Sequence, residues 1–133
     1  MTNDFSDIQR IAKDKFGAAC VQRTGNAFSL EFDEGEISFA AIPGNPAFSI
    51  VRARVLDMSG VGRVGGLALA ALEGNFFWSG TNGGTLSADE DGSLWLTERR
   101  PVAELASPEG LDNCISEFAK TVSAWRERSA LHE

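Results

Sequence analysis

The sequence predicts an α+β fold in which an antiparallel sheet is built from hairpins and flanked by helices. Short strands with alternating apolar and polar residues occur in neighbouring pairs, each pair joined by turn residues. Segments with helical apolar spacing occur at both ends of the chain. Strands grouped into hairpins are typical of α+β proteins with antiparallel sheets. The expected order is α-β-β-β-α-β-β-α, within one domain over residues 1–133.

The first helix is expected from a cap at Asn3 or Asp4 to about Phe16, where Gly17 ends it. Its apolar residues Phe5, Ile8, Ala12 and Phe16 recur at helical spacing and form one face.

A hairpin follows, with strands over 26–32 and 36–42 and a tight turn at 33–35. Residues 43–46 (PGNP) are a loop, and a third strand is expected from Phe48 to Leu56. One side of this strand carries two apolar residues followed by two arginines: Phe48, Ile50, Arg52 and Arg54. That side is therefore predicted to reach solvent in part.

The second helix is expected over 61–77, although the glycines at its start weaken it by about 1 kcal/mol each relative to alanine. Arg63 and Glu73 are its only charged residues. A helix that is apolar on all sides must be covered on all sides. The sheet of a 133-residue domain covers one side, so the other side predicts a second copy of the chain, a homodimer.

A second hairpin is expected over 84–89 and 93–100, around the favoured turn pair Asp91-Gly92. Pro101 ends it, and Ser107-Pro108-Glu109 is a helix start with cap, proline and acid in order. The final helix then carries an apolar stripe with steps of 4, 3, 4 and 3: Leu111, Ile115, Phe118, Val122 and Trp125.

Composition limits the partners and the compartment. The net charge of −7 disfavours nucleic acid and membrane surfaces, which are polyanions. The first ten residues lack the pattern of a signal peptide, and no apolar stretch approaches the 18 residues or so of a membrane span. Cys20 and Cys114 form neither a CxxC pair nor half of a zinc site. The expectation is a cytosolic protein with reduced, partly buried thiols and no metal.

Two motifs suggest ligand chemistry, and the sequence around each argues against it. Gly60 to Gly65 matches GxGxxG, but it follows a hairpin and not the first strand of a parallel βαβ unit. Residues 87–98 approach a calcium loop, but Ser87 replaces the first aspartate and the flanks are strand-like. A flexible helix entry and an acidic hairpin tip are the simpler interpretations.

Catalytic groups are nearly absent. The only histidine, His132, lies close to the end of the chain, and neither cysteine has an evident base partner. We expect no enzyme activity, no cofactor and no small-molecule substrate. The apolar strand positions, such as Phe28 and Phe39, are either core or the lining of an exposed groove for a partner.

Essentially the whole chain resembles, in its order of elements, the class I effector chaperones of type III secretion, the Tir-chaperone-like family, and the clearest stretches lie in its second half. The resemblance rests on residues 69–77 (LAALEGNFF), 83–89 (GGTLSAD) and 94–102 (LWLTERRPV), with Phe118, Ala119 and Trp125 in the last helix. The size and the acidity agree with this family, whereas the glycine-rich entry to the second helix departs from it.

The resemblance implies a bacterial cytoplasmic protein of virulence systems that binds the N-terminal region of one cognate secreted effector in extended form. It implies that the chaperone keeps this region soluble and presents it to the export apparatus, without ATP or metal. The alternative is a non-enzymatic adaptor or regulatory protein on the same fold.

The resemblance also assigns residues. The implied homodimer is built mainly around the second helix. Effector anchors are implied to pack on the first helix and first sheet, with strand addition at a sheet edge as a further mode of binding. Expected dimer residues are Val64, Leu67, Ala68, Ala71, Leu72, Phe76 and Trp95. Expected effector-binding residues are Phe5, Ile8, Phe28, Leu30, Phe32, Ile37, Phe39 and Ile50.

Overall fold

The computed structural model describes residues 4–24, 26–32, 35–58, 64–76, 80–81 and 83–130. Its elements confirm the predicted α+β class. They are α1 (Phe5–Phe16), η1 (Gly17–Ala19), β1 (Cys20–Thr24), β2 (Ala27–Phe32), β3 (Gly35–Ala41), β4 (Phe48–Asp57), α2 (Val64–Asn75), β5 (Thr85–Ala88), β6 (Ser93–Pro101), α3 (Val102–Leu105) and α4 (Pro108–Ala130).

The strands form one six-stranded sheet in the order β1-β2-β3-β4-β6-β5. The two predicted hairpins are present as antiparallel pairs: Phe28 lies opposite Phe39, and Leu86 lies opposite Leu96. Both edge strands are short, β1 with five residues and β5 with four.

The chain divides into two compact units. One, called here the α1 unit, comprises residues up to Arg52 together with Arg99–Glu117. The other, the α2 unit, comprises Ala53–Glu98 together with the chain from Phe118. The strands β4 and β6 and the helix α4 each contribute one part to each unit. The single-domain prediction therefore stands as a prediction, which cooperative unfolding would test.

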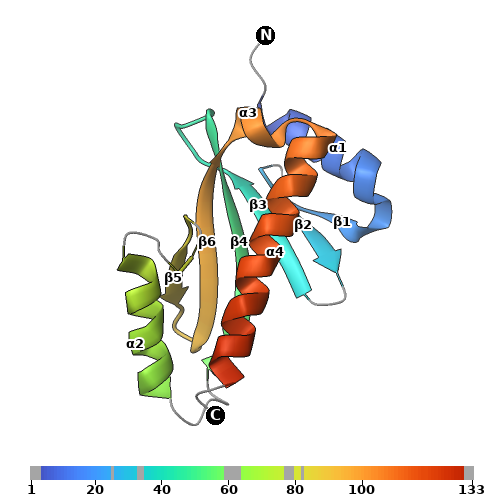
Figure 1. Cartoon of the computed structure of the whole chain (residues 1–133). Helices are drawn as coiled ribbons and strands as arrows, with labels where there is room; N and C mark the ends of the chain where they lie inside the picture. The colour runs from blue at the N-terminus through green and yellow to red at the C-terminus, as the bar shows by residue number, and fades with distance from the viewer. Residues whose placement is uncertain are drawn as a thin grey trace. The chain divides into compact units, whose positions relative to one another are not determined.

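In the α1 unit, α1 begins where the sequence predicts. The Asp4 side chain accepts the Asp7 backbone N–H and the Asp7 side chain accepts the Asp4 N–H, which is a capping box. Gly17 ends the helix at a φ of 55°, a conformation that favours glycine. Figure 1 shows α1 alongside β1 and β2.

Aromatic rings hold α1 to the sheet of its unit. The Phe28 and Phe39 rings stack with centroids 5.0 Å apart, and Phe5 lies 5.6 Å from Phe28. Phe16 meets Phe32 edge to face at 5.9 Å. Such pairs are worth about 0.5–1.5 kcal/mol each beyond the apolar area that they bury.

In the α2 unit, α2 runs alongside β5 (Figure 1) and packs against Trp125 of α4. A side-chain carbon on Gly74 would lie 2.5 Å from the Trp125 ring, so only glycine allows this approach. The Trp125 indole N–H donates to the Gly80 carbonyl at 2.8 Å, and the Gly80 N–H donates to the Gly74 carbonyl at 2.9 Å.

The last helix also follows the prediction. The Gly110 backbone N–H donates to the Ser107 hydroxyl at 3.0 Å, so Ser107 caps α4, and the helix begins at Pro108. The five residues of the predicted apolar stripe, which runs from Leu111 to Trp125, are all buried. Arg126 donates to the carbonyls of Val55 and Arg54 at 2.7 and 3.0 Å.

Three elements are absent from the expected order. The short helix η1 and the strand β1, which pairs with β2, precede the first predicted hairpin. The one-turn helix α3 lies between β6 and α4. The start of the second helix at 61–63 and its end at 77 lie outside the described residues, as do Asp33 and Glu34 of the first turn. Among the helices that the structure describes, none is long and apolar enough to cross a membrane.

Candidate binding surfaces

Large apolar side chains are exposed along one side of α2. Val64 is 47% exposed, Leu69 59%, Leu72 68% and Phe76, just after the helix, 70%. Among the residues that the structure describes, these four are the exposed large hydrophobic side chains. Contiguous exposed apolar surface of this kind marks sites of protein association.

The opposite side of α2 explains why this surface points outward. Leu67, Ala70, Ala71 and Gly74 are buried within the α2 unit. Because the close contact of Gly74 with Trp125 fixes the rotation of the helix about its axis, the other side is left to solvent. The charge on the described helix is limited to Glu73, so polar groups do not screen that side.

The structure divides the predicted dimer residues into two groups. Val64, Ala68, Leu72 and Phe76 lie on the exposed side, whereas Leu67 and Ala71 are buried and hold α2 to its own unit. Trp95 is half-buried on β6, and its indole N–H donates to Asp89 at 2.8 Å. The sequence analysis missed Leu69, although the all-round apolar character of the helix included it.

The predicted effector-binding residues also divide. Phe5, Phe32 and Ile50 are half-buried, so part of each side chain remains at the surface. The other five are buried in the core of the α1 unit: Ile8, Phe28, Leu30, Ile37 and Phe39.

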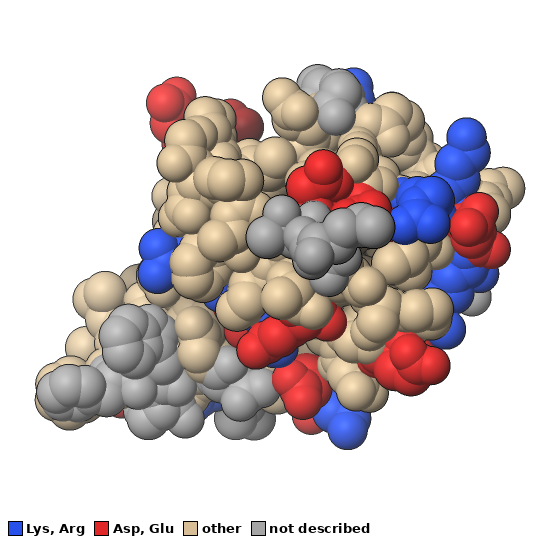
Figure 2. All heavy atoms as spheres, turned by 90° about the horizontal axis from the view of Figure 1, so that it is seen from above, with Lys and Arg blue, Asp and Glu red and all other residues tan. Residues whose placement is uncertain are grey.

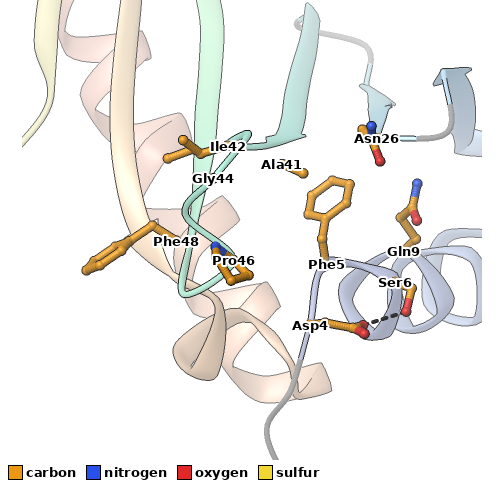
Figure 3. Close-up of a pocket in the computed structure, with 10 residues that line it drawn as sticks. All are labelled: Asp4, Phe5, Ser6, Gln9, Asn26, Ala41, Ile42, Gly44, Pro46 and Phe48. Atoms are coloured by element: carbon orange, nitrogen blue, oxygen red, sulfur yellow. Dashed lines mark hydrogen bonds between the residues drawn. The ribbon is translucent and has the colours of Figure 1, made fainter.

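A hollow of about 300 Å3 lies between the start of α1 and the loop that precedes β4. In Figure 3 the Phe5 ring points from α1 toward Ala41, and the Phe48 ring points away from the other labelled side chains. Apolar groups therefore form part of its wall and polar groups the rest. Its lining is Asp4, Phe5, Ser6, Gln9, Asn26, Ala41, Ile42, Gly44, Pro46 and Phe48.

The outer side of β4 carries the mixed pattern that the sequence predicts. Phe48 and Ile50 are half-buried and Arg52 is exposed, while Ser49 and Val51 between them are buried. The Arg99 guanidinium lies over the Phe48 ring, 4.5 Å from its centroid, in a cation–π contact. This strip offers apolar contact and positive charge together.

Charge on the molecular surface is mixed in sign. Figure 2 shows acidic and basic side chains interspersed on the face that it presents. Arg23 bonds Glu36 at 3.0 Å and lies 3.5 Å from Glu31, and Arg100 bonds Glu117 at 3.1 Å. The net charge of −7 therefore comes from a modest excess of carboxylates.

Two carboxylates have lowered pKa values because of local hydrogen bonds. The Trp95 indole N–H, followed by the Ser93 backbone N–H, holds the pKa of Asp89 below its ordinary value. The Ser6 hydroxyl, followed by the Asp7 backbone N–H, does the same for Asp4. The Asp89 carboxylate therefore stabilises the turn of its hairpin, and the Asp4 carboxylate stabilises the start of α1.

The structure gives the ligand motifs little to bind with. In the calcium-like segment, Asp89 accepts N–H groups from Asp91, Ser93 and Trp95 of its own hairpin. Within the described ranges no group of three or more His, Cys, Asp or Glu side chains is placed to hold a metal. The GxGxxG segment falls mostly on 60–63, outside the described residues.

Cys20 and Cys114 are not joined in a disulfide in this structure. Cys20 is half-buried at the start of β1, and Cys114 is buried in α4. Burial raises the pKa of the Cys20 thiol, against a smaller opposing effect of Lys13. A raised pKa makes a thiol less reactive, which agrees with a structural role.

The chain matches the model of the Tir chaperone protein (CesT) family over residues 29–126. It belongs to this family. The match includes β2 to β6, α2 and most of α4, and so spans both units. No curated protein sequence matches this Tir chaperone family member.

Solved structures share the fold of this family member at low sequence identity. One is the ExsC–ExsE complex, with a TM-score of 0.76, 17% identity and coverage of 95% of this chain and 96% of the other. A second is the HopA1–SchA chaperone–effector complex, with a TM-score of 0.62, 14% identity and coverage of 95% of this chain and 99% of the other. A third is the Yersinia pestis type III secretion chaperone SycH in complex with a stable fragment of YscM2. Its TM-score is 0.60 and its identity 14%, with coverage of 97% of this chain and 98% of the other.

Proposed function

We propose that this Tir chaperone family member is a type III secretion chaperone. It binds the N-terminal region of one cognate effector in extended form, keeps that region soluble and secretion-competent, and presents it to the export apparatus in the bacterial cytoplasm. The family match over residues 29–126 carries this proposal. The similar structures named above, one of which is a chaperone–effector complex by its own description, support it.

The functional unit of this proposal is a homodimer formed through α2. The exposed side of the helix carries Leu69, Leu72 and Phe76, each more than half exposed. Burying side chains of this size contributes about 1.5–3 kcal/mol each. A two-fold contact buries the same side chains on both copies, so the gain is doubled.

The effector is proposed to contact the α1 unit through surfaces that remain open. The hollow beside Phe5 is large enough for an apolar anchor side chain, and the strip of Phe48, Ile50 and Arg52 lies on β4, which begins where the loop of the hollow ends. An extended segment that carries spaced apolar residues suits these surfaces. The excess of acidic groups on the chaperone favours a neutral or basic segment.

The test begins with affinity purification from the source bacterium and identification of any stoichiometric partner. The N-terminal region of that partner is then co-expressed with the chaperone and examined by light scattering and limited proteolysis. We expect two chaperones per partner and protection of roughly 50–100 partner residues, because coupled folding over such a length is ordinary. A partner that binds through a folded domain, and without its N-terminal region, would instead support the adaptor alternative.

A matched pair of variants locates the binding surface. Ile42→Asp places a charge in the wall of the hollow and is expected to weaken binding at least about tenfold, because an apolar anchor no longer fits beside it. Lys120→Asp, at an exposed position of α4, is the control and is expected to bind as the unmodified protein does. Equal binding by both variants would remove the hollow from the proposal.

A further inference from the structure

The end strand β5 has its outward backbone groups occupied by a side chain. The Leu86 N–H donates to the Asn75 side-chain oxygen at 2.8 Å, and the Asn75 side-chain amide donates to the Leu86 carbonyl at 3.0 Å. β5 pairs with β6 on its other side and is the last strand of the sheet. Asn75 therefore bonds Leu86 in the way that a neighbouring strand would.

The preceding outward position is also closed, here by the backbone carbonyl and the hydroxyl of Thr81. The Gly84 N–H donates to the Thr81 backbone carbonyl at 3.1 Å, and the Thr81 hydroxyl donates to the Gly84 carbonyl at 2.6 Å. Thr81 is 1% exposed, so this contact is shielded from water. The backbone at Gly84 lies tight against Leu96 of β6, because a side-chain carbon on Gly84 would come within 2.8 Å of Leu96.

The two closures lie in one row. Backbone groups that point to the same side of a strand recur at every second residue. Gly84 and Leu86 are two residues apart, so four consecutive donors and acceptors along this edge are bonded within the α2 unit. An added strand would need those groups, because ladder hydrogen bonds are what an edge strand offers a partner.

We propose that Asn75 and Thr81 seal the edge of β5 against strand addition by other copies of this chain. The need for a seal follows from the position of α2. Its exposed apolar side brings copies together, and α2 runs alongside β5, so an open edge there would be offered to each approaching copy. With the edge sealed, copies meet through the side chains of α2, and association stops at a closed contact.

This inference rests on the association of copies through α2 that the proposed function includes, and not on the binding of an effector. Its readout is the mass of the free protein without any effector. It compares a variant with the unmodified protein, whatever oligomeric state the latter has.

The test is the double variant Asn75→Ala, Thr81→Val, which removes both side-chain clamps and keeps the shape of Thr81. In dilute solution we expect the Leu86 amide to exchange hydrogen at least about tenfold faster than in the unmodified protein, because its bond partner is gone. As concentration rises we expect a mass above that of the unmodified protein, with the Leu86 amide protected again by intermolecular pairing.

Two further variants complete the test. Ser87→Lys, at an exposed position of β5, places a charge of the type that protects natural sheet edges, and is expected to restore the unmodified mass to the double variant. Asn75→Asp keeps the acceptor for the Leu86 N–H and removes the donor to its carbonyl. It serves with the same readouts if the double variant does not fold. Faster Leu86 exchange with an unchanged mass at all concentrations would overturn the proposal.

Discussion

The helices α1 and α2 each bury one side within their own unit but differ in what they present on the other side. α1 is polar on its outer side, with Asp7, Arg10 and Lys13 facing away from its buried residues, and none of the exposed large apolar side chains among the described residues lies in its unit. α2 is apolar on both sides and leaves four large side chains exposed. The difference supports the proposed association of copies through α2.

The largest expected effect comes from charging the exposed side of α2. The double variant Leu72→Glu, Phe76→Glu is expected to convert the proposed dimer to monomer, with a loss of affinity of at least about 100-fold, because two apolar contacts per copy are lost and charge is placed in the interface. Sedimentation equilibrium measures the dissociation constant of the dimer. Lys120→Glu on α4 is the control, and a variant that remains dimeric would place the interface elsewhere.

The second effect concerns how α2 is held. Gly74→Ala is expected to lower the free energy of unfolding by about 1–3 kcal/mol, because the new methyl group collides with the Trp125 ring. Gly65→Ala, where nothing lies within 4 Å of the added carbon, is expected to raise it by about 0.5–1 kcal/mol, because alanine favours the helix. Chemical denaturation measures the free energy of unfolding of both variants. Changes of the same sign in the two variants would contradict this packing.

The third effect is a pH dependence in the hairpin of β5 and β6. The pKa of Asp89 is lowered in the folded protein, so its contribution to stability is present above the unfolded value of 3.8 and is lost as the pH falls through the folded value. Asp89→Ala is therefore expected to be less stable than the unmodified protein at pH 7, with a gap that narrows as the pH falls below 3.8. Denaturation midpoints at pH 7, 5 and 3 measure the gap, and a constant gap would exclude the carboxylate as its cause.

The smallest expected difference lies between the unfolding midpoints of the two units. Because β4, β6 and α4 each run through both units, we expect one cooperative transition over residues 1–133. The difference between the two midpoints is measured by hydrogen exchange through a denaturant series. The amides followed are those of Leu30 in the α1 unit and Leu96 in the α2 unit. Two separated transitions would show that the single-domain prediction is wrong.

Local signals in the sequence predicted most of the fold. The caps at Asp4 and Ser107, the stop at Gly17 and the apolar stripe of α4 depend on neighbouring residues, so they could be read without tertiary information. β1 was missed because Cys20 to Thr24 shows weak alternation and takes its shape from pairing with β2. The Gly25-Asn26 pair that follows it is a hairpin signal that was available in the sequence.

The candidate surfaces were predicted less well, for a physical reason. Alternation shows that Phe28 and Phe39 share a side of a hairpin, but not whether a helix covers that side, and α1 does cover it. Likewise, the composition of α2 predicts that a partner is needed without showing which residues face it. That distinction between Leu67 and Leu72 comes from the contact of Gly74 with Trp125, which lies 51 positions later in the sequence.

The composition of the α1 unit from two distant stretches has a consequence for synthesis on the ribosome. Residues up to Arg52 emerge first, but α3, which contacts α1, and the start of α4 are translated only after the first stretch of the α2 unit. The Val102 N–H that bonds the Ala47 carbonyl arrives equally late. A nascent chain that has reached Glu98 therefore holds both units incomplete at once, and the α1 unit is completed only when Arg99–Glu117 has been translated.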